Sequence, residues 1–302
     1  WAVCIFLVGL IAAGTFRLVA HMTTSKKRQF RAEGIEKLDA GDYAGAIGSF
    51  DTALEKSGKG AEEFNRDVLL YRADAEFLLK DYNAAIHTYD LLLEMRPDIP
   101  EYMYRQSSCR ARLGDTDNAI KRYQEAEALV KKDKPVPGRQ EALLAAGSAC
   151  VDAKEYDKAM ALYEDALKDG MEHGEIYNQM GLCQMAAQDY QSAYDSFDKG
   201  YQAAALQEKD RKTGKETDKK ETKDGDAGTT QSGETVNGES APAGVAQADG
   251  SRELLKELSY NRAVACEHLQ QYDKALAMFE DFVKEFGSDE DAEHEIAFLK
   301  TR

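Results

Sequence analysis

The sequence lacks the short motifs by which catalytic and metal-binding sites are usually recognised. Its five cysteines include no CxxC pair, and its five histidines are scattered, with no HExxH motif. No GxSxG or GxGxxG motif occurs, and residues 57–60 lack the upstream glycine and the Ser or Thr of a phosphate-binding loop. These absences predict a protein that is not an enzyme and that holds no metal ion or cofactor.

Runs of β-branched residues are also rare, whereas Ala, Gln, Glu and Lys are abundant. Strands are enriched in β-branched and aromatic residues and depleted in Ala, Glu and Lys. The composition therefore predicts an all-α protein.

Positive charge is in deficit, because 39 Lys and Arg residues face 55 Asp and Glu residues and the net charge is −16. Nucleic-acid binding needs Lys and Arg to replace the counterions of the phosphates. The balance therefore argues against a general nucleic-acid partner. It suits solubility, or protein partners that are basic.

What the chain does contain is a helical pattern that returns six times. Each copy has a small residue, an alanine twelve positions later and an aromatic residue four positions further on. The copies are Gly34/Ala46/Phe50, Ala73/Ala85/Tyr89, Ser107/Ala119/Tyr123, Gly147/Ala159/Tyr163, Gly181/Ala193/Phe197 and Ala263/Ala275/Phe279. Self-similarity at a period near 34 residues is typical of a solenoid of stacked helix pairs.

The residue types in this pattern suit two helices that pack closely. Glycine inside a helix costs about 1 kcal/mol relative to alanine, a cost that is tolerated where two backbones must approach each other. The aromatic residue lies one turn from the alanine on the same helix face and is expected to fill the space between helices. Turn signals separate the two helices of each pair, at 40–42, 80–81, 113–115, 154–155, 188–189 and 270–271. Five of these turns are followed by Tyr-x-x-Ala, at Tyr43, Tyr82, Tyr156, Tyr190 and Tyr272.

Together these features resemble the tetratricopeptide repeat, over residues 27–206 for five repeats and 251–302 for a sixth repeat with a capping helix near 291–300. The repeats begin near Lys27, Arg66, Pro100, Gln140, Gly174 and Lys256. The resemblance implies a right-handed α-solenoid of about six helix pairs. In style the chain is similar to bacterial, envelope-associated members of this family.

Four of the cysteines occupy equivalent places in the repeats. Cys109, Cys150, Cys183 and Cys266 fall at the tenth or eleventh position of four different first helices. This regularity indicates small apolar packing residues.

The resemblance also implies where a partner would bind. In tetratricopeptide repeats the second, fifth, sixth, ninth, twelfth and thirteenth positions tend to face the concave side. These positions include Tyr71, Asp74, Tyr104, Arg105, Ser108, Arg112, Asn178, Gln179, Tyr260, Asn261 and His268. Such a mixture suits an extended or helical peptide held by aromatic contacts and side-chain hydrogen bonds, although ordinary solvated helix residues are the alternative.

Some family members clamp the C-terminal carboxylate of a peptide with Lys, Asn and Arg from successive repeats. Only Arg105 and Asn261 match that set, and they lie in distant repeats. A clamp of this kind is therefore not expected.

An apolar run opens the chain, from Ala2 to Phe16. Its length suits the core of a signal peptide, and residues 12–14 (Ala-Ala-Gly) offer small residues for cleavage. The alternative is that residues 1–22 form an uncleaved membrane anchor. A span of about 20 residues would then include Arg17, near one end, where its side chain can reach the interface.

Two further interpretations of this run are open. Residues 10–14 resemble a lipobox, but Thr15 stands where the acylated cysteine belongs, so lipidation is not expected there. A buried helix that caps the solenoid is disfavoured because no apolar stripe is visible. Export to the cell envelope or membrane association is therefore expected. The basic residues 26–28 would favour repeats on the cytoplasmic side of an uncleaved anchor.

Residues 207–250 interrupt the repeats and are dominated by Gly, Thr, Ser, Asp, Glu and Lys. Such a segment cannot bury enough apolar surface to offset chain entropy, so it is predicted to be a disordered polar linker. It is either an inserted surface loop, since the closure cost grows slowly with length, or a partner-binding segment that orders on contact.

The sequence thus predicts a non-enzymatic scaffold that binds a protein or peptide in the concave groove of its repeats. Two alternatives remain. The solenoid could be a structural or assembly factor that self-associates, or an accessory subunit of an envelope or secretion complex.

Overall fold

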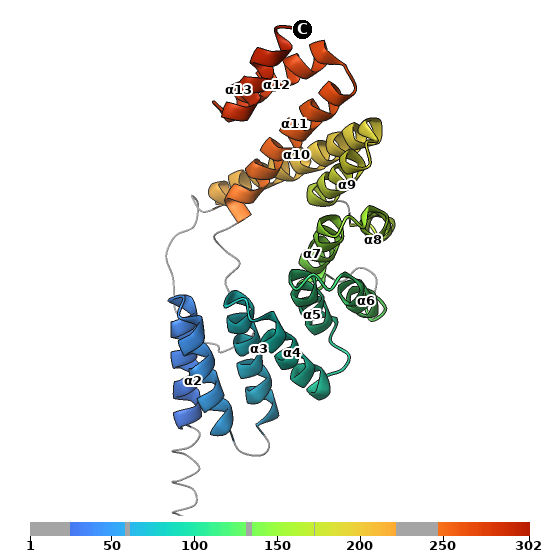
Figure 1. The fold of residues 1–302 in the computed structure, drawn as a ribbon. Helices are drawn as coiled ribbons and strands as arrows, with labels where there is room; N and C mark the ends of the chain where they lie inside the picture. Colours follow the sequence, from blue (N-terminus) through green and yellow to red (C-terminus); the bar gives the residue numbers. More distant parts are fainter. Residues whose placement is uncertain (1–24, 58–60, 131–134, 172, 222–246) are drawn as a thin grey trace, which may run out of the picture. The chain divides into compact units, whose positions relative to one another are not determined.

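The computed structural model describes residues 25–57, 61–130, 135–171, 173–221 and 247–302. These residues are helical apart from short connections, and they include no strand (Figure 1). The predicted all-α class is therefore confirmed. The chain divides into two compact units, Trp1–Ala153 (unit 1) and Lys154–Arg302 (unit 2).

Unit 1 is a succession of helix pairs, in which the first helix of each repeat is called the A helix and the second the B helix. Residues 25–39 are helical and are followed by α2 (Tyr43–Glu55), α3 (Glu62–Leu78), α4 (Tyr82–Met95), α5 (Pro100–Arg112), α6 (Thr116–Glu127) and α7 (Arg139–Asp152). From α2 to α6 each helix packs on the next, and α5 also contacts α7. The A helices of the third and fourth repeats are therefore direct neighbours.

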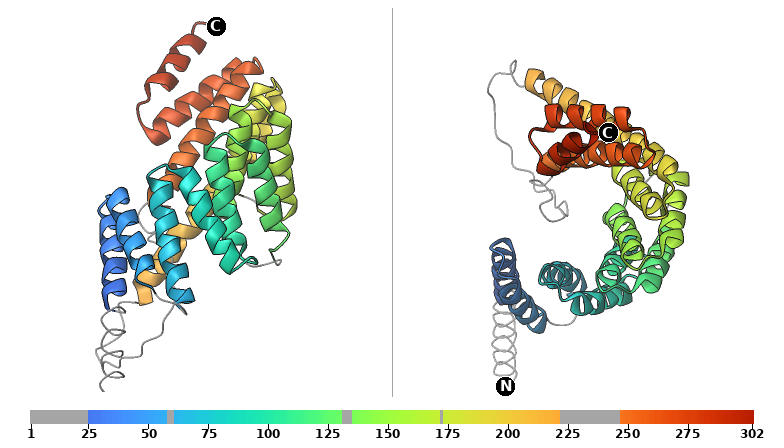
Figure 2. Two further views of the ribbon diagram at one scale, coloured as in Figure 1. Left: turned by 60° about the horizontal axis from the view of Figure 1, so that its bottom comes forward. Right: turned by 45° about the horizontal axis from the view of Figure 1, so that its top comes forward.

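Unit 2 continues in the same way. It contains α8 (Tyr156–Lys168), α9 (Gly174–Ala186), α10 (Tyr190–Glu221), α11 (Gln247–His268), α12 (Tyr272–Phe286) and α13 (Glu290–Leu299). Each of these helices packs on the next, as the two views of Figure 2 show for α9 to α13, and the A helices α9 and α11 also touch. The last helix, α13, lies where a capping helix is predicted. It buries Ala292 and Leu299 against the aromatic side chains of α12.

The turns between A and B helices share one backbone conformation. One residue in each turn has a positive φ, between 61° and 80°: Gly41, Lys80, Gly114, Lys154, Gln188 and Gln270. After α5, the amide of Gly114 donates to the carbonyl of Ala111 and the amide of Asp115 donates to the carbonyl of Arg110, both at 3.0 Å. This pair of bonds is the Schellman arrangement that ends a helix, so the predicted turns are confirmed.

The recurrent glycine and aromatic residues face each other in the first and fifth helix pairs. A Cβ atom at Gly34 would lie 2.4 Å from the ring of Phe50, and one at Gly181 would lie 2.4 Å from the ring of Phe197. In the third repeat, the Ser107 hydroxyl donates to a B-helix carbonyl at 2.8 Å. The six central alanines, 46, 85, 119, 159, 193 and 275, are fully buried. The repeated pattern is therefore the packing core, as predicted.

The predicted bounds of the disordered linker, residues 207–250, are wrong at both ends, because α10 continues to Glu221 and α11 begins at Gln247. Residues 207–221 are rich in Lys and Glu, which favour helix, and they place opposite charges four residues apart, as at Glu208 and Lys212. The segment also extends a helix that is already packed, and extension costs less than nucleation. Residues 222–246 lie outside the described residues.

The predicted N-terminal apolar segment, residues 1–22, also lies outside the described residues. Among the helices that the structure does describe, none combines the length and the apolarity that a membrane span requires.

Candidate partner-binding surfaces

Tyr104, Ser108 and Asn178, all predicted to line a groove, are buried instead, with exposed fractions of 0%, 7% and 2%. The ring of Tyr104 packs against that of Tyr123, with centroids 5.5 Å apart, so it fills the space between α5 and α6. These three side chains do not offer an open surface, and this part of the prediction is wrong.

The hydroxyl of Tyr104 belongs to a polar network that joins three helices. It donates to the Glu127 carboxylate at 2.6 Å, and Arg139 at the start of α7 binds both oxygens of that carboxylate at 2.8 and 2.5 Å. Burial by itself raises the pKa of Glu127, but the hydrogen bonds from Arg139 and Tyr104 outweigh burial and lower it. The network therefore holds the third repeat to the fourth.

Arg105 is the centre of a charged group on the A helices of unit 1. Burial opposes its charge, but Tyr89 and the carboxylates of Asp74, Glu101 and Glu141 outweigh burial and raise its pKa. Burial also raises the pKa of Asp74 and of Glu101, by more than the attraction of Arg105 lowers it. One guanidinium is thus acted on electrostatically by three carboxylates, which come from α3, α5 and α7 and outnumber it.

The predicted residues Asp74 and Arg105 are therefore brought together, whereas Glu101 and Glu141 were not predicted. Both glutamates occupy the second position of their repeats, counted from Pro100 and Gln140. The positional rule that selected Tyr104 and Arg105 would have found them.

Tyr71 is half-buried within the first two repeats. Its ring stacks on that of Phe50 with centroids 6.0 Å apart, and the guanidinium of Arg31 lies 5.1 Å above it. Arg31 also makes two hydrogen bonds to the carboxylate of Asp67. Tyr71 thus packs against side chains of its own unit.

In unit 2 the structure joins two predicted residues directly. Asn261 on α11 donates from Nδ2 to Oδ1 of Asn178 on α9 at 3.0 Å, and Asn178 donates to Glu257 at 2.9 Å. Gln179, the next residue on α9, is half-buried. These contacts connect the fifth and sixth repeats on the side where their A helices meet.

The other predicted residues differ in exposure. Tyr260 is half-buried and packs edge-on against Phe279 and Phe282 of the core, with centroids 5.5 and 5.7 Å away. His268 is exposed and stacks on Tyr190 at 4.5 Å. Arg112 is exposed at the end of α5.

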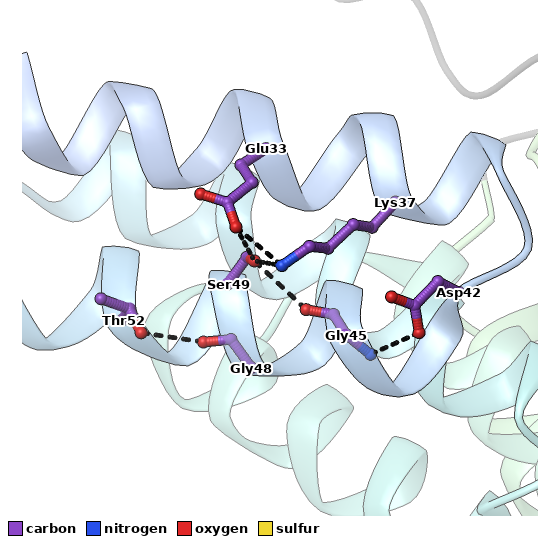
Figure 3. Close-up of polar contacts among 7 residues, drawn as sticks. All are labelled: Glu33, Lys37, Asp42, Gly45, Gly48, Ser49 and Thr52. Atoms are coloured by element: carbon purple, nitrogen blue, oxygen red, sulfur yellow. Dashed lines mark hydrogen bonds and ion pairs between the residues drawn. The ribbon is translucent and has the colours of Figure 1, made fainter.

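Polar residues that were not predicted link A and B helices at a fixed offset of twelve residues. In the first repeat Lys37 Nζ lies 2.7 Å from Glu33 and donates to the Ser49 hydroxyl at 2.9 Å (Figure 3). Thr88 donates to the buried Glu76 at 2.7 Å. The side chains of Gln184 and Ser196 also lie 2.7 Å apart. The twelve-residue offset that separates the small residue from the alanine in each repeat also separates these polar partners, so the sequence could have revealed them.

A pocket of about 420 Å³ opens in unit 2 between α10, α11 and α12. Its lining carries charges of both signs, from Arg262, Lys284, Asp281 and Glu285, together with Tyr201, Ser259 and Met278. Within the described part of the chain, no group of three or more His, Cys, Asp or Glu residues is placed to hold a metal ion.

Comparison with known proteins gives matches over a large part of the chain. A family model described as the tetratricopeptide repeat matches residues 31–100, 79–133 and 104–173. The BBSome complex member BBS4 homolog of Drosophila melanogaster is 27% identical over 150 residues, which are 50% of this chain and 29% of that protein. The chain thus spans less than a third of the length of this relative.

Solved structures are similar in fold at lower identity. The crystal structure of PilW, described as a widely conserved type IV pilus biogenesis factor, has a TM-score of 0.53 and 15% identity, covering 90% of this chain and 97% of PilW. A crystal structure of MamA has a TM-score of 0.49 and 21% identity, covering 62% of this chain and 96% of MamA.

Proposed function

Because the chain belongs to the tetratricopeptide repeat family, we propose that it is a non-enzymatic scaffold that binds a protein partner along its A helices. Repeats of this kind present a preformed surface, so binding requires no covalent step and no cofactor. The fold supports a protein partner, and the charge of the chain favours one that is basic.

The observation that carries this proposal is the charged group around Arg105. Its members come from three successive A helices, and three carboxylates share one guanidinium. A peptide that crosses these helices would meet charged groups, of which Asp74, Glu101 and Arg105 are half-buried and Glu141 is exposed. Such groups provide orientation and specificity in protein recognition.

A test starts from a photo-crosslinking residue placed at Arg112, which is exposed on α5, and at Lys168, which is exposed on the B helix α8. The proposal expects crosslinking of one partner from position 112 and not from position 168. With that partner purified, Arg105→Ala should raise the Kd by about tenfold, the effect of a moderate hot spot, while Lys168→Ala leaves it unchanged. Equal crosslinking from both positions, or an unchanged Kd for Arg105→Ala, would reject the proposal.

Self-association is a second candidate, and exposed leucines favour it. Leu79 and Leu113 are the fourteenth residues of the second and third repeats, and they are 46% and 45% exposed at the A-to-B turns. Sedimentation at increasing concentration separates the two functions. A monomer at all concentrations removes this candidate, whereas a dimer that Leu79→Ser and Leu113→Ser dissociate supports it.

Attachment to a membrane through residues 1–22, or export, stays a proposal that rests on the apolar run alone. Membrane fractionation of cells that express the full chain tests it. Recovery of the intact chain only in the soluble fraction would reject an anchor.

A further inference from the structure

A second pocket, of about 510 Å³, lies in unit 1 and does not belong to the A-helix surface. It is formed mainly by the B helix α4, by Pro97 after it, by Met103 of α5 and by Arg122 of the B helix α6. Its volume falls within the range of pockets that bind small groups in proteins. From this pocket we infer a second binding site, which receives an arginine side chain of a protein partner.

Half of the residues that line the pocket are apolar. Leu91, Leu93, Pro97 and Met103 contribute hydrocarbon and thioether groups, and the two leucines also pack against the buried core of the second repeat. A surface of this kind suits the aliphatic stem of a long side chain, whose charged end reaches the rim.

The lining also carries the negative charge that such an end requires. Asp90 and Glu94 lie four residues apart on α4 and therefore on the same face of the helix. Two basic side chains also line the pocket, the imidazole of His87 and the guanidinium of Arg122, which is paired with Glu125 at 2.9 Å. Two carboxylates thus line the pocket beside a guanidinium that already has a counterion, and a second cation complements them.

Asp90 is held in place by a hydrogen bond from the buried side chain of Gln106. The side chain of Gln106 is fully buried, and its Nε2 donates to Asp90 Oδ1 at 2.7 Å and to the Ile86 carbonyl at 3.1 Å. The Oε1 atom of Gln106 has no hydrogen-bond partner within the described residues. A buried amide with an unpaired oxygen destabilises a core, so this residue is costly for packing alone. The hydrogen bond from Gln106 does, however, hold the Asp90 carboxylate at the wall of the pocket.

Arginine fits this arrangement better than lysine. Its guanidinium is planar, more weakly hydrated than an ammonium group, and offers several donors to more than one carboxylate. The pocket therefore selects an arginine side chain, which a basic segment of the partner would present.

Nuclear magnetic resonance of the full chain with ¹³C-labelled methionine methyl groups tests this inference, with Met103 as the reporter. The probe is N-acetyl-arginine amide, titrated into the millimolar range at constant ionic strength. N-acetyl-citrulline amide, which has nearly the same shape without the charge, is the control ligand. A saturable shift of the Met103 methyl signal with the arginine probe, and a much weaker one with citrulline, is expected.

Variants of the chain provide the second control. Asp90→Asn and Glu94→Gln should each weaken the apparent affinity about two- to fivefold, as expected for a partly exposed ion pair. Asp39→Asn, which removes the same charge from an exposed site outside the pocket, should not change it. Equal shifts with citrulline, no saturable shift of Met103, or equal weakening by Asp39→Asn would overturn the inference. None of these results bears on the crosslinking expected from position 112.

Discussion

Asn261 donates a hydrogen bond to Asn178 at 3.0 Å, although 83 residues separate them in the chain. Asn178 is 2% exposed and lies on α9, whereas Asn261 lies on α11, after the segment that interrupts the repeats. The fifth and sixth repeats are therefore joined by a polar contact as well as by apolar packing. The interruption in the sequence does not interrupt the stacking of these two repeats.

Asn178→Ala should destabilise unit 2, because it leaves both Asn261 and Glu257 without their partner. Loss of one buried hydrogen-bonding group costs about 1–3 kcal/mol in the free energy of unfolding. Urea denaturation followed by circular dichroism measures it. A double-mutant cycle with Asn261→Ala should give a coupling energy clearly different from zero, and strict additivity would contradict the contact. Gln179→Ala, at the adjacent half-buried position, is the matched control and should have little effect.

The close approach of A and B helices predicts opposite effects for two glycines. At Gly34 an added methyl group would meet the Phe50 ring at 2.4 Å, so Gly34→Ala should lower the free energy of unfolding by about 1–3 kcal/mol. Nothing lies within 4 Å of the Cβ position of Gly48 on α2, which is exposed (Figure 3). Gly48→Ala should therefore stabilise by up to about 1 kcal/mol. Thermal unfolding of both variants tests this, and shifts of the same sign would refute the packing argument.

The A-to-B turns offer sites for stabilisation. Lys80 and Gln188 hold φ values of 65° and 63°, which cost a residue with a side chain about 1 kcal/mol or more. Part of the gain from glycine is lost to its greater freedom in the unfolded chain. Lys80→Gly and Gln188→Gly should thus each raise the stability by about 0.5–1 kcal/mol. Gly114→Ala, in the equivalent turn, should lower the melting temperature. A lower melting temperature for both glycine variants would contradict this expectation.

Acid should weaken the network around Glu127. The pKa of this carboxyl group is lowered in the folded chain, so the unfolded chain takes up the proton first as the pH falls. Its contribution to stability is complete above the unfolded pKa, near 4.5, and is lost as the pH falls through the lower folded value. Glu127→Gln should therefore destabilise the protein at neutral pH and flatten the acid limb of a stability profile.

Glu101 provides the contrasting case. Burial raises its pKa, so its ionised form is unfavourable in the folded chain at neutral pH. Glu101→Gln should increase the stability at pH 7, and this gain should disappear in acid, where the native carboxyl group is protonated as well. Urea titrations of both variants between pH 3 and pH 7 measure the change in the free energy of unfolding that each substitution causes, and so compare the signs of the two changes. A common sign for Glu101→Gln and Glu127→Gln at neutral pH would refute these assignments.

The elements that follow from local rules were predictable. The contact of Gly34 with Phe50 follows from the need of two helices to approach, and the turn at Gly114 follows from the φ that glycine favours. Pro100 begins α5 as predicted, because proline fits the first turn of a helix, where an unpaired amide is normal. These properties depend only on the residues of a single repeat.

The candidate site was less predictable because burial depends on side-chain contacts between helices, which the positional rule does not describe. Tyr104 fits the positional rule for a groove, yet its ring is buried beside Tyr123, and only the presence of Glu127 in the next helix explains its hydroxyl group. The bond between Asn178 and Asn261 depends on how α11 docks after a long interruption. The length of α10 was missed because a polar composition was taken as disorder, although its charges are spaced to support a helix.

Four buried thiols, one on each of α5, α7, α9 and α11, provide internal reporters of local opening. Burial raises the pKa of Cys109 to about 12 and also raises that of Cys266, so these thiols react with an alkylating reagent only when their helix opens. In a linear array each repeat is stabilised mainly by its neighbours, and opening need not be simultaneous along the chain. The order in which the four cysteines are alkylated in native conditions would therefore map cooperativity along the array, without any label being introduced.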